Sequence, residues 1–116
     1  MLLSVIALTA LVTVQTANAQ DKKEQWPGVT IKVLIDNEHV NVSEVTFAAG
    51  AVADWHSHLH YTIYAVTAIK MQVDVKDKET TTVEMKAGQS AWSPAVTHKT
   101  TNVGKTPFTA IVTEIK

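Results

Sequence analysis

The chain after residue 28 is built from short stretches rich in Val, Ile and Thr, separated by turn-forming residues. Apolar and polar residues alternate over much of each stretch, which is typical of β-strands. No long stretch repeats apolar residues at the spacing of a helix. Many short strands between turns predict an all-β sandwich or barrel. The expected strands cover residues 29–35, 39–47, 61–75, 80–85, 90–92, 96–102 and 108–115.

The N-terminal part of the chain differs from the rest. Residues 1–14 carry no charge and are rich in Leu, Val, Ile and Ala, and an Ala-x-Ala triplet ends at Ala19. This pattern is typical of a secretory signal peptide, although no basic residue lies near the start. The alternative is a buried N-terminal strand or helix. We expect a signal peptide over residues 1–19, a tether over residues 20–28 and one domain over residues 29–116, in a periplasmic or secreted protein without membrane contact after processing.

The composition narrows the classes of function. Apolar residues make up 46% of the 116 residues and charged residues 18%, which is typical of one globular domain. A net charge of −1 gives no reason to expect binding to nucleic acid. The chain has no arginine, the residue best suited to bidentate capture of carboxylate or phosphate. Since it also has no cysteine, any metal must be held by nitrogen and oxygen atoms.

The histidines form the strongest chemical pattern in the sequence. Three of the five, His56, His58 and His60, stand at alternate positions. Alternate residues of a strand point to one face, so all three side chains can enter one space. Neutral imidazoles bind divalent transition metals such as Fe, Zn, Mn, Ni and Cu. The alternative is a solvated, histidine-rich strand, but the pattern favours a metal site.

Two segments around these histidines resemble the sequence motifs of the cupin superfamily. In the first, five residues separate a glycine from a His-x-His triplet, and here these are Gly50, His56 and His58. In the second, five residues separate a glycine from a proline, and three residues separate a later histidine from an asparagine. Here these residues are Gly88, Pro94, His98 and Asn102. The resemblance covers essentially the whole of the expected mature chain, residues 20–116.

The resemblance implies a double-stranded β-helix, or jelly roll, with a metal ion inside the barrel. It also implies that His56, His58 and His98 are ligands that leave positions open for a substrate or dioxygen. The sequence departs from the family pattern, which has a glutamate shortly after the second histidine, where this chain has Thr62 and Ile63. The missing glutamate favours a site of three histidines, His56, His58 and His98. His60 is a candidate for a fourth ligand, or for an acid or base beside the metal.

Alternation beyond the histidines predicts which side chains of the next strand enter the pocket. Tyr64 shares the parity of His60, and these two residues are the candidates for a catalytic role. Residues of the opposite parity, Leu59, Tyr61 and Ile63, would expose an apolar row to water. We therefore expect a homodimer that covers this row, unless the row packs beneath the N-terminal segment of the same chain.

Three kinds of function are compatible with such a site. The first is a metal-dependent dioxygenase or related oxidoreductase that acts on a small molecule, because histidine ligands with open positions suit that chemistry. The second is a non-catalytic module that binds a metal or a small ligand. The third is isomerase or lyase chemistry at the same site. The sequence favours the enzyme over the binding module.

Overall fold

The computed structural model describes residues 22–116, and over this range it is built from ten β-strands. Within this range no helix is long and apolar enough to span a membrane. The expected signal peptide lies outside the described residues. The strands are β1 (Lys23–Trp26), β2 (Val29–Asp36), β3 (Val40–Phe47), β4 (Val52–His58), β5 (Tyr61–Ala65), β6 (Ile69–Val75), β7 (Thr81–Met85), β8 (Ser90–Ser93), β9 (Val96–Asn102) and β10 (Phe108–Ile115).

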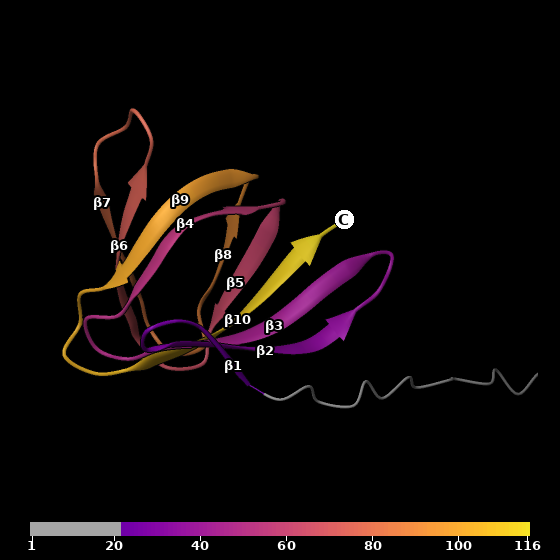
Figure 1. Cartoon of the computed structure of the whole chain (residues 1–116), viewed down its shortest axis with the longest axis horizontal. Helices are drawn as coiled ribbons and strands as arrows, with labels where there is room; N and C mark the ends of the chain where they lie inside the picture. The colour runs from indigo at the N-terminus through magenta and orange to yellow at the C-terminus, as the bar shows by residue number, and fades with distance from the viewer. Residues whose placement is uncertain (1–21) are drawn as a thin grey trace, which may run out of the picture.

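The strands form two antiparallel sheets, which confirms the predicted all-β class (Figure 1). The first sheet has six strands in the order β1-β2-β3-β10-β5-β8, and the second has four in the order β4-β9-β6-β7. The chain crosses from one sheet to the other at six connections: β3–β4, β4–β5, β5–β6, β7–β8, β8–β9 and β9–β10. Such crossings wind the chain into two facing layers, as in a jelly roll.

Two predicted elements differ from the observed ones. The expected tether, residues 20–28, contains β1, which pairs with β2 at the edge of the six-stranded sheet. The expected single stretch over residues 61–75 is two strands, because the chain leaves one sheet at Ala65 and joins the other at Ile69. The backbone N–H groups of Val66 and Thr67 both donate to the carbonyl of Thr109 at this crossing.

The two motif glycines lie at turns that require their conformational freedom. Gly50 has a φ of 77° between β3 and β4, and Gly88 has a φ of 87° between β7 and β8. Positive φ is unfavourable for residues with a Cβ atom. These two turns therefore start the strands β4 and β8 that follow the glycines.

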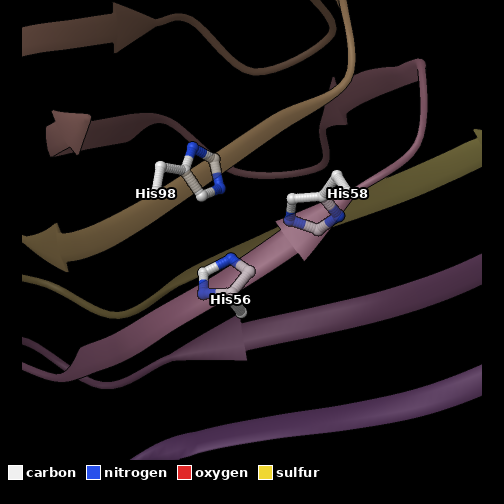
Figure 2. A group of neighbouring side chains, drawn as sticks. All are labelled: His56, His58 and His98. Carbon is white, nitrogen blue, oxygen red and sulfur yellow. The ribbon is translucent and has the colours of Figure 1, made fainter. Parts of the chain in front are cut away.

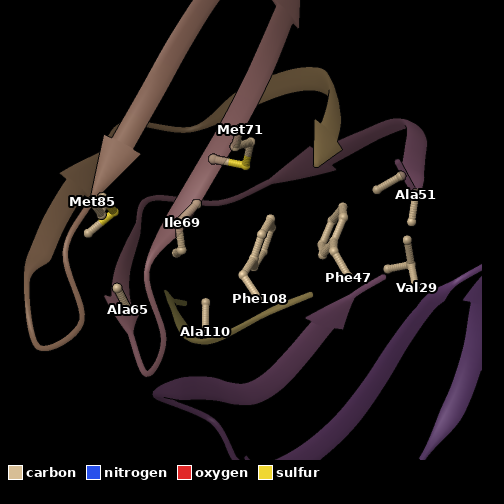
Figure 3. Packing of buried hydrophobic residues seen from close by; sticks show 10 residues of the cluster. Val29, Phe47, Ala51, Ala65, Ile69, Met71, Met85, Phe108 and Ala110 are labelled. Carbon is tan, nitrogen blue, oxygen red and sulfur yellow. The ribbon is translucent and has the colours of Figure 1, made fainter. Parts of the chain in front are cut away.

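The hydrophobic core lies between the two sheets, as Figure 3 shows. Val29, Phe47 and Phe108 are register partners across β2, β3 and β10, and all three are buried. The rings of Phe47 and Phe108 stack with centroids 4.7 Å apart. Met71 on β6 belongs to the same cluster but comes from the opposite sheet. The packing of Met71 with these residues therefore holds the two sheets together.

Asn102 fastens the loops at one end of the barrel. Its side chain is buried, and Nδ2 donates to the carbonyl oxygens of Phe47, Ala48 and Thr106. Its Oδ1 accepts a hydrogen bond from the backbone N–H of Gly104. The asparagine of the second motif thus satisfies buried backbone groups of two separate segments.

Candidate metal centre

A β-bulge in β4 sets the direction of the first two histidines. Ala53 pairs with Thr100 of β9, and His56 pairs with His98, so β4 has one more residue than β9 between these two pairs. A bulge reverses the alternation of side chains beyond it. Ala53 packs in the core, and the bulge brings His56 to the same side of the sheet three residues later.

Three histidines meet between β4 and β9, as Figure 2 shows. His56 and His58 come from β4, and His98 comes from the neighbouring strand β9. Each histidine has one ring nitrogen in this group, and the three nitrogens all lie within 4.8 Å of one another. Three imidazole nitrogens at this separation can bind one transition-metal ion. The structure thus brings together three of the four predicted ligands.

Hydrogen bonds orient two of the three rings. Nδ1–H of His56 donates to the backbone carbonyl of Asp54 at 2.6 Å, and His58 Nδ1 hydrogen-bonds Oε1 of Glu114 at 2.5 Å. A carbonyl or carboxylate oxygen can only accept, so the proton of each ring belongs on Nδ1. Nε2 of each neutral ring then keeps its lone pair for a metal ion.

Burial favours the neutral form of two of the three histidines, His56 and His98. His98 is only 4% exposed, and desolvation with the nearby imidazoles of His56 and His58 lowers its pKa to about 4. Desolvation also lowers the pKa of His56, although its bond to the Asp54 carbonyl acts in the opposite direction. Neutral imidazole is the form that binds metals, so His56 and His98 are prepared for an ion near neutral pH.

The three histidines stand at the wall of a cavity of about 90 Å³. Both sheets contribute apolar side chains to it, including Phe47 and Phe108 from the first and Met71 from the second. Trp26 of β1 also lines the cavity, with its ring 5.2 Å from that of His56. The lining contains no lysine, aspartate or glutamate among the described residues. A metal ion at the histidines would therefore face a largely apolar space.

Comparison with solved structures decides the family. The crystal structure of a cupin domain from Bordetella pertussis Tohama I matches this fold with a TM-score of 0.72 and 30% sequence identity. The match covers 81% of this chain and 99% of that one. This chain belongs to the cupin superfamily.

More distant cupins share the fold. A double-stranded β-helix protein from Methanocaldococcus jannaschii, described as RmlC-like, has a TM-score of 0.65 at 14% identity, over 89% of this chain and 93% of that one. The polyketide cyclase RemF from Streptomyces resistomycificus has a TM-score of 0.65 at 18% identity, over 89% and 78%. At these identities the likeness shows the cupin fold alone. No protein-family profile and no curated protein matches the sequence.

The structure places His60 apart from the other histidines of this cupin. β4 ends at His58, so the alternation that was expected to include His60 stops before it. The ring of His60 stacks instead on Trp92, with centroids 5.7 Å apart and an interplanar angle of 7°. The prediction that His60 shares the face of His56 and His58 is therefore wrong, and the three-histidine group does not include it.

The predicted faces of β5 are also reversed. Tyr64, the other catalytic candidate, is 45% exposed and does not line the cavity, whereas Tyr61 and Ile63 do. The physical reason is the turn at residues 59–60, which restarts the alternation. The apolar row expected outside is therefore wrong for Tyr61 and Ile63, although Leu59 is exposed. The homodimer stays a prediction, now without that argument.

Two groups beside the histidines were not predicted from the sequence to lie at the site. Tyr61 is buried, and its ring centroid lies 4.6 Å from that of His58. Burial raises the pKa of the Tyr61 phenol, which keeps its proton. Glu114 of β10 has the sequence context of an ordinary strand carboxylate, yet it contacts His58. Its parity with Phe108 was the available signal, because alternate residues of β10 face the interior.

Proposed function

We propose that His56, His58 and His98 hold one divalent first-row transition metal, and that the adjoining cavity receives a small molecule. The observation that carries the proposal is the convergence of three imidazole nitrogens within 4.8 Å. The donor set fits Fe, Zn, Mn, Ni or Cu, because imidazole suits all of these ions and the chain has no cysteine to supply a thiolate. We also propose that the protein works in the periplasm or outside the cell.

The cavity favours a small, uncharged and largely apolar molecule. Its lining, over the part of the chain that the structure describes, provides no lysine to bind an anion and no carboxylate to bind a cation. Its volume of about 90 Å³ is below the roughly 150 Å³ of an apolar cavity that holds benzene. A larger ligand would have to displace a side chain. Trp26 is the lining residue that can move most easily, because it lies on the edge strand β1.

The reaction that we propose is that of a metal-dependent dioxygenase or related oxidoreductase. A bound ion would supply Lewis acidity and open coordination positions. The ligand nitrogens of the three histidines lie within 4.8 Å of one another, and the wall of the adjoining cavity is mostly apolar. The protonated phenol of Tyr61 lies beside His58 and provides a hydrogen-bond donor near the site.

A non-catalytic binding module is the second candidate, and the small volume of the cavity favours it. Isomerase or lyase chemistry is a third, since a polyketide cyclase and DMSP lyases share the fold. The fold alone does not choose among these reactions. Oxygen uptake in the presence of small uncharged substrates separates the dioxygenase from the binding module, because only the enzyme consumes oxygen with turnover.

Metal analysis of the untagged protein tests the site itself. We expect about one divalent ion per chain after purification, or after incubation with the ion followed by gel filtration. His39→Ala is the matched control, because His39 is exposed and lies beside Glu38, away from the cluster. A wild-type protein that retains no more metal than His58→Ala would overturn the proposal.

A further inference from the structure

The contact between Glu114 and His58 joins the last strand to the metal centre. Oε1 of Glu114 lies 2.5 Å from Nδ1 of His58, although β10 and β4 belong to different sheets. The Glu114 side chain is only 26% exposed and the His58 side chain 19%. A charged group this far withdrawn from water is normally held by a specific partner.

The strand directs Glu114 inward. Phe108, Ala110 and Val112 precede it at alternate positions, and all three contribute to the core or the cavity wall. Glu114 therefore stands where the pattern calls for an apolar side chain. The first-motif positions for a carboxylate are occupied by Thr62, which is exposed on the outer face of β5, and by Ile63, an apolar residue of the cavity wall. Glu114 thus brings a carboxylate to the histidines from the opposite end of the sequence.

We propose that Glu114 is a positioning residue of the metal centre. It accepts the Nδ1 proton of His58, fixes the rotation of that ring and leaves Nε2 with its lone pair toward the metal. This inference rests on the proposed function, because its purpose is to present His58 to an ion. A carboxylate behind a metal-binding histidine orients the ring and increases its basicity.

The arrangement of His56 supports this role. Its Nδ1–H donates to the carbonyl of Asp54, so both histidines of β4 have the same ring nitrogen occupied. In His56 the bulge supplies the acceptor from the backbone of the same strand. His58 lies at the end of β4, and its acceptor is a side chain from the facing sheet.

A direct ligand role for Glu114 is the competing explanation, and the geometry favours positioning. The group of side chains whose ligand atoms lie within 4.8 Å of one another contains His56, His58 and His98, but not Glu114. The carboxylate oxygen is engaged with Nδ1 of His58, which leaves Nε2 as the nitrogen of that ring that can bind an ion.

Imidazole ¹⁵N NMR of the metal-free protein tests the positioning role without any metal. At pH 8.5, well above the pKa of about 6.5 of free histidine, the spectrum reports which nitrogen of His58 carries the proton. We expect the Nδ1–H tautomer in the wild type and in Glu114→Gln, whose amide oxygen can still accept. Glu114→Ala should raise the fraction of the Nε2–H tautomer. Wild-type His58 protonated on Nε2 would overturn the inference.

Zn²⁺ competition titrations of the same proteins provide the second readout. We expect Glu114→Ala to weaken binding by roughly 10–100-fold, and Glu114→Gln to lie closer to the wild type than to Glu114→Ala. Glu44→Ala is the matched control, because Glu44 has a similarly exposed side chain (30%) on β3 and does not line the cavity. Equal losses in the Gln and Ala variants would mean that Glu114 is a direct ligand, which overturns positioning.

The two readouts separate the inference from the proposed function. If the wild type binds Zn²⁺ but neither the tautomer nor the affinity responds to Glu114→Ala, the positioning role fails and the metal site stands. If the wild type binds none of the divalent ions, the proposed function fails and the metal role of Glu114 with it. Should Glu114→Ala not fold, Glu114→Asp, which withdraws the carboxylate by one methylene, replaces it with the same expected losses.

Discussion

His56 and His98 are direct register partners on adjacent antiparallel strands, with ring centroids 4.7 Å apart. They are 42 residues apart in the sequence, and the pairing of β4 with β9 brings them together. The extra residue in the bulge of β4 turns His56 to the inner side. The metal centre therefore depends on strand register as much as on the histidines themselves.

Removing His98 should abolish stable metal binding, because two imidazoles of one strand would remain without their third partner. We expect His98→Ala to fall from about one ion per chain to a small fraction, as measured by elemental analysis after gel filtration. His60→Ala should keep its metal, because its ring stacks on Trp92 outside the cluster. A His98→Ala protein that retains full occupancy at neutral pH would contradict the three-histidine site.

The stability of the metal-free protein should fall as the pH drops from about 6.5 toward 4. The folded state holds the pKa of His98 at about 4, and the unfolded chain returns it to 6.5. Between these values the unfolded state binds a proton that the folded state does not, so the free energy of unfolding decreases with decreasing pH. The fall from 6.5 to about 4 corresponds to roughly 3 kcal/mol.

Urea unfolding at several pH values measures this effect. His98→Asn removes the titrating group, so its unfolding free energy should depend less on pH over the same window. An unchanged pH dependence in His98→Asn would show that other groups cause the decrease. Metal should be released over the same pH range, because protonated imidazole has no lone pair to donate.

Phe108→Ala should be strongly destabilising. Phe108 is 1% exposed and stacks on Phe47 where the two sheets meet, and truncating a buried Phe costs about 3–5 kcal/mol. Tyr64→Ala removes an aromatic side chain of the outer face and should change the unfolding free energy by only about 0.5 kcal/mol. Equal losses in the two variants, measured by urea unfolding, would contradict the assignment of the core.

Asn102→Asp should destabilise the barrel although the two side chains have nearly the same shape. The carboxylate cannot donate to the three carbonyl oxygens that Asn102 Nδ2 contacts, and it places negative charge beside them. We expect a loss of about 3 kcal/mol or more in the free energy of unfolding. Asn37→Asp is the control, since the exposed Asn37 side chain accepts from the backbone N–H groups of His39 and Val40, and a comparable loss there would refute the explanation.

Processing of the N-terminus is tested by N-terminal sequencing of protein expressed from the whole sequence in an exporting host. The Ala-x-Ala triplet predicts a mature chain that begins at or near Gln20. Ala19→Arg should block cleavage, because the position before the cut requires a small residue. Mature protein that still begins at Leu2 or Leu3 would show that no signal peptide is removed.

The sequence by itself determined the elements and most of the candidate ligands. Alternation and turn residues predicted most of the strands, and the two motifs singled out His56, His58 and His98. These features are local. The pattern of a strand extends over a few consecutive residues, and a motif is defined by fixed spacings between residues.

Only the tertiary structure showed which residues near strand ends and on the facing sheet belong to the site. The alternation of side chains does not continue across the turn between β4 and β5. His60 and Tyr64 therefore do not line the cavity, whereas Tyr61 does. Glu114 reaches His58 only because β10 lies in the sheet that faces β4. The alternation of side chains holds only within one strand. Turns, bulges and the packing of the two sheets determine whether a given set of alternate side chains faces the interior or the solvent.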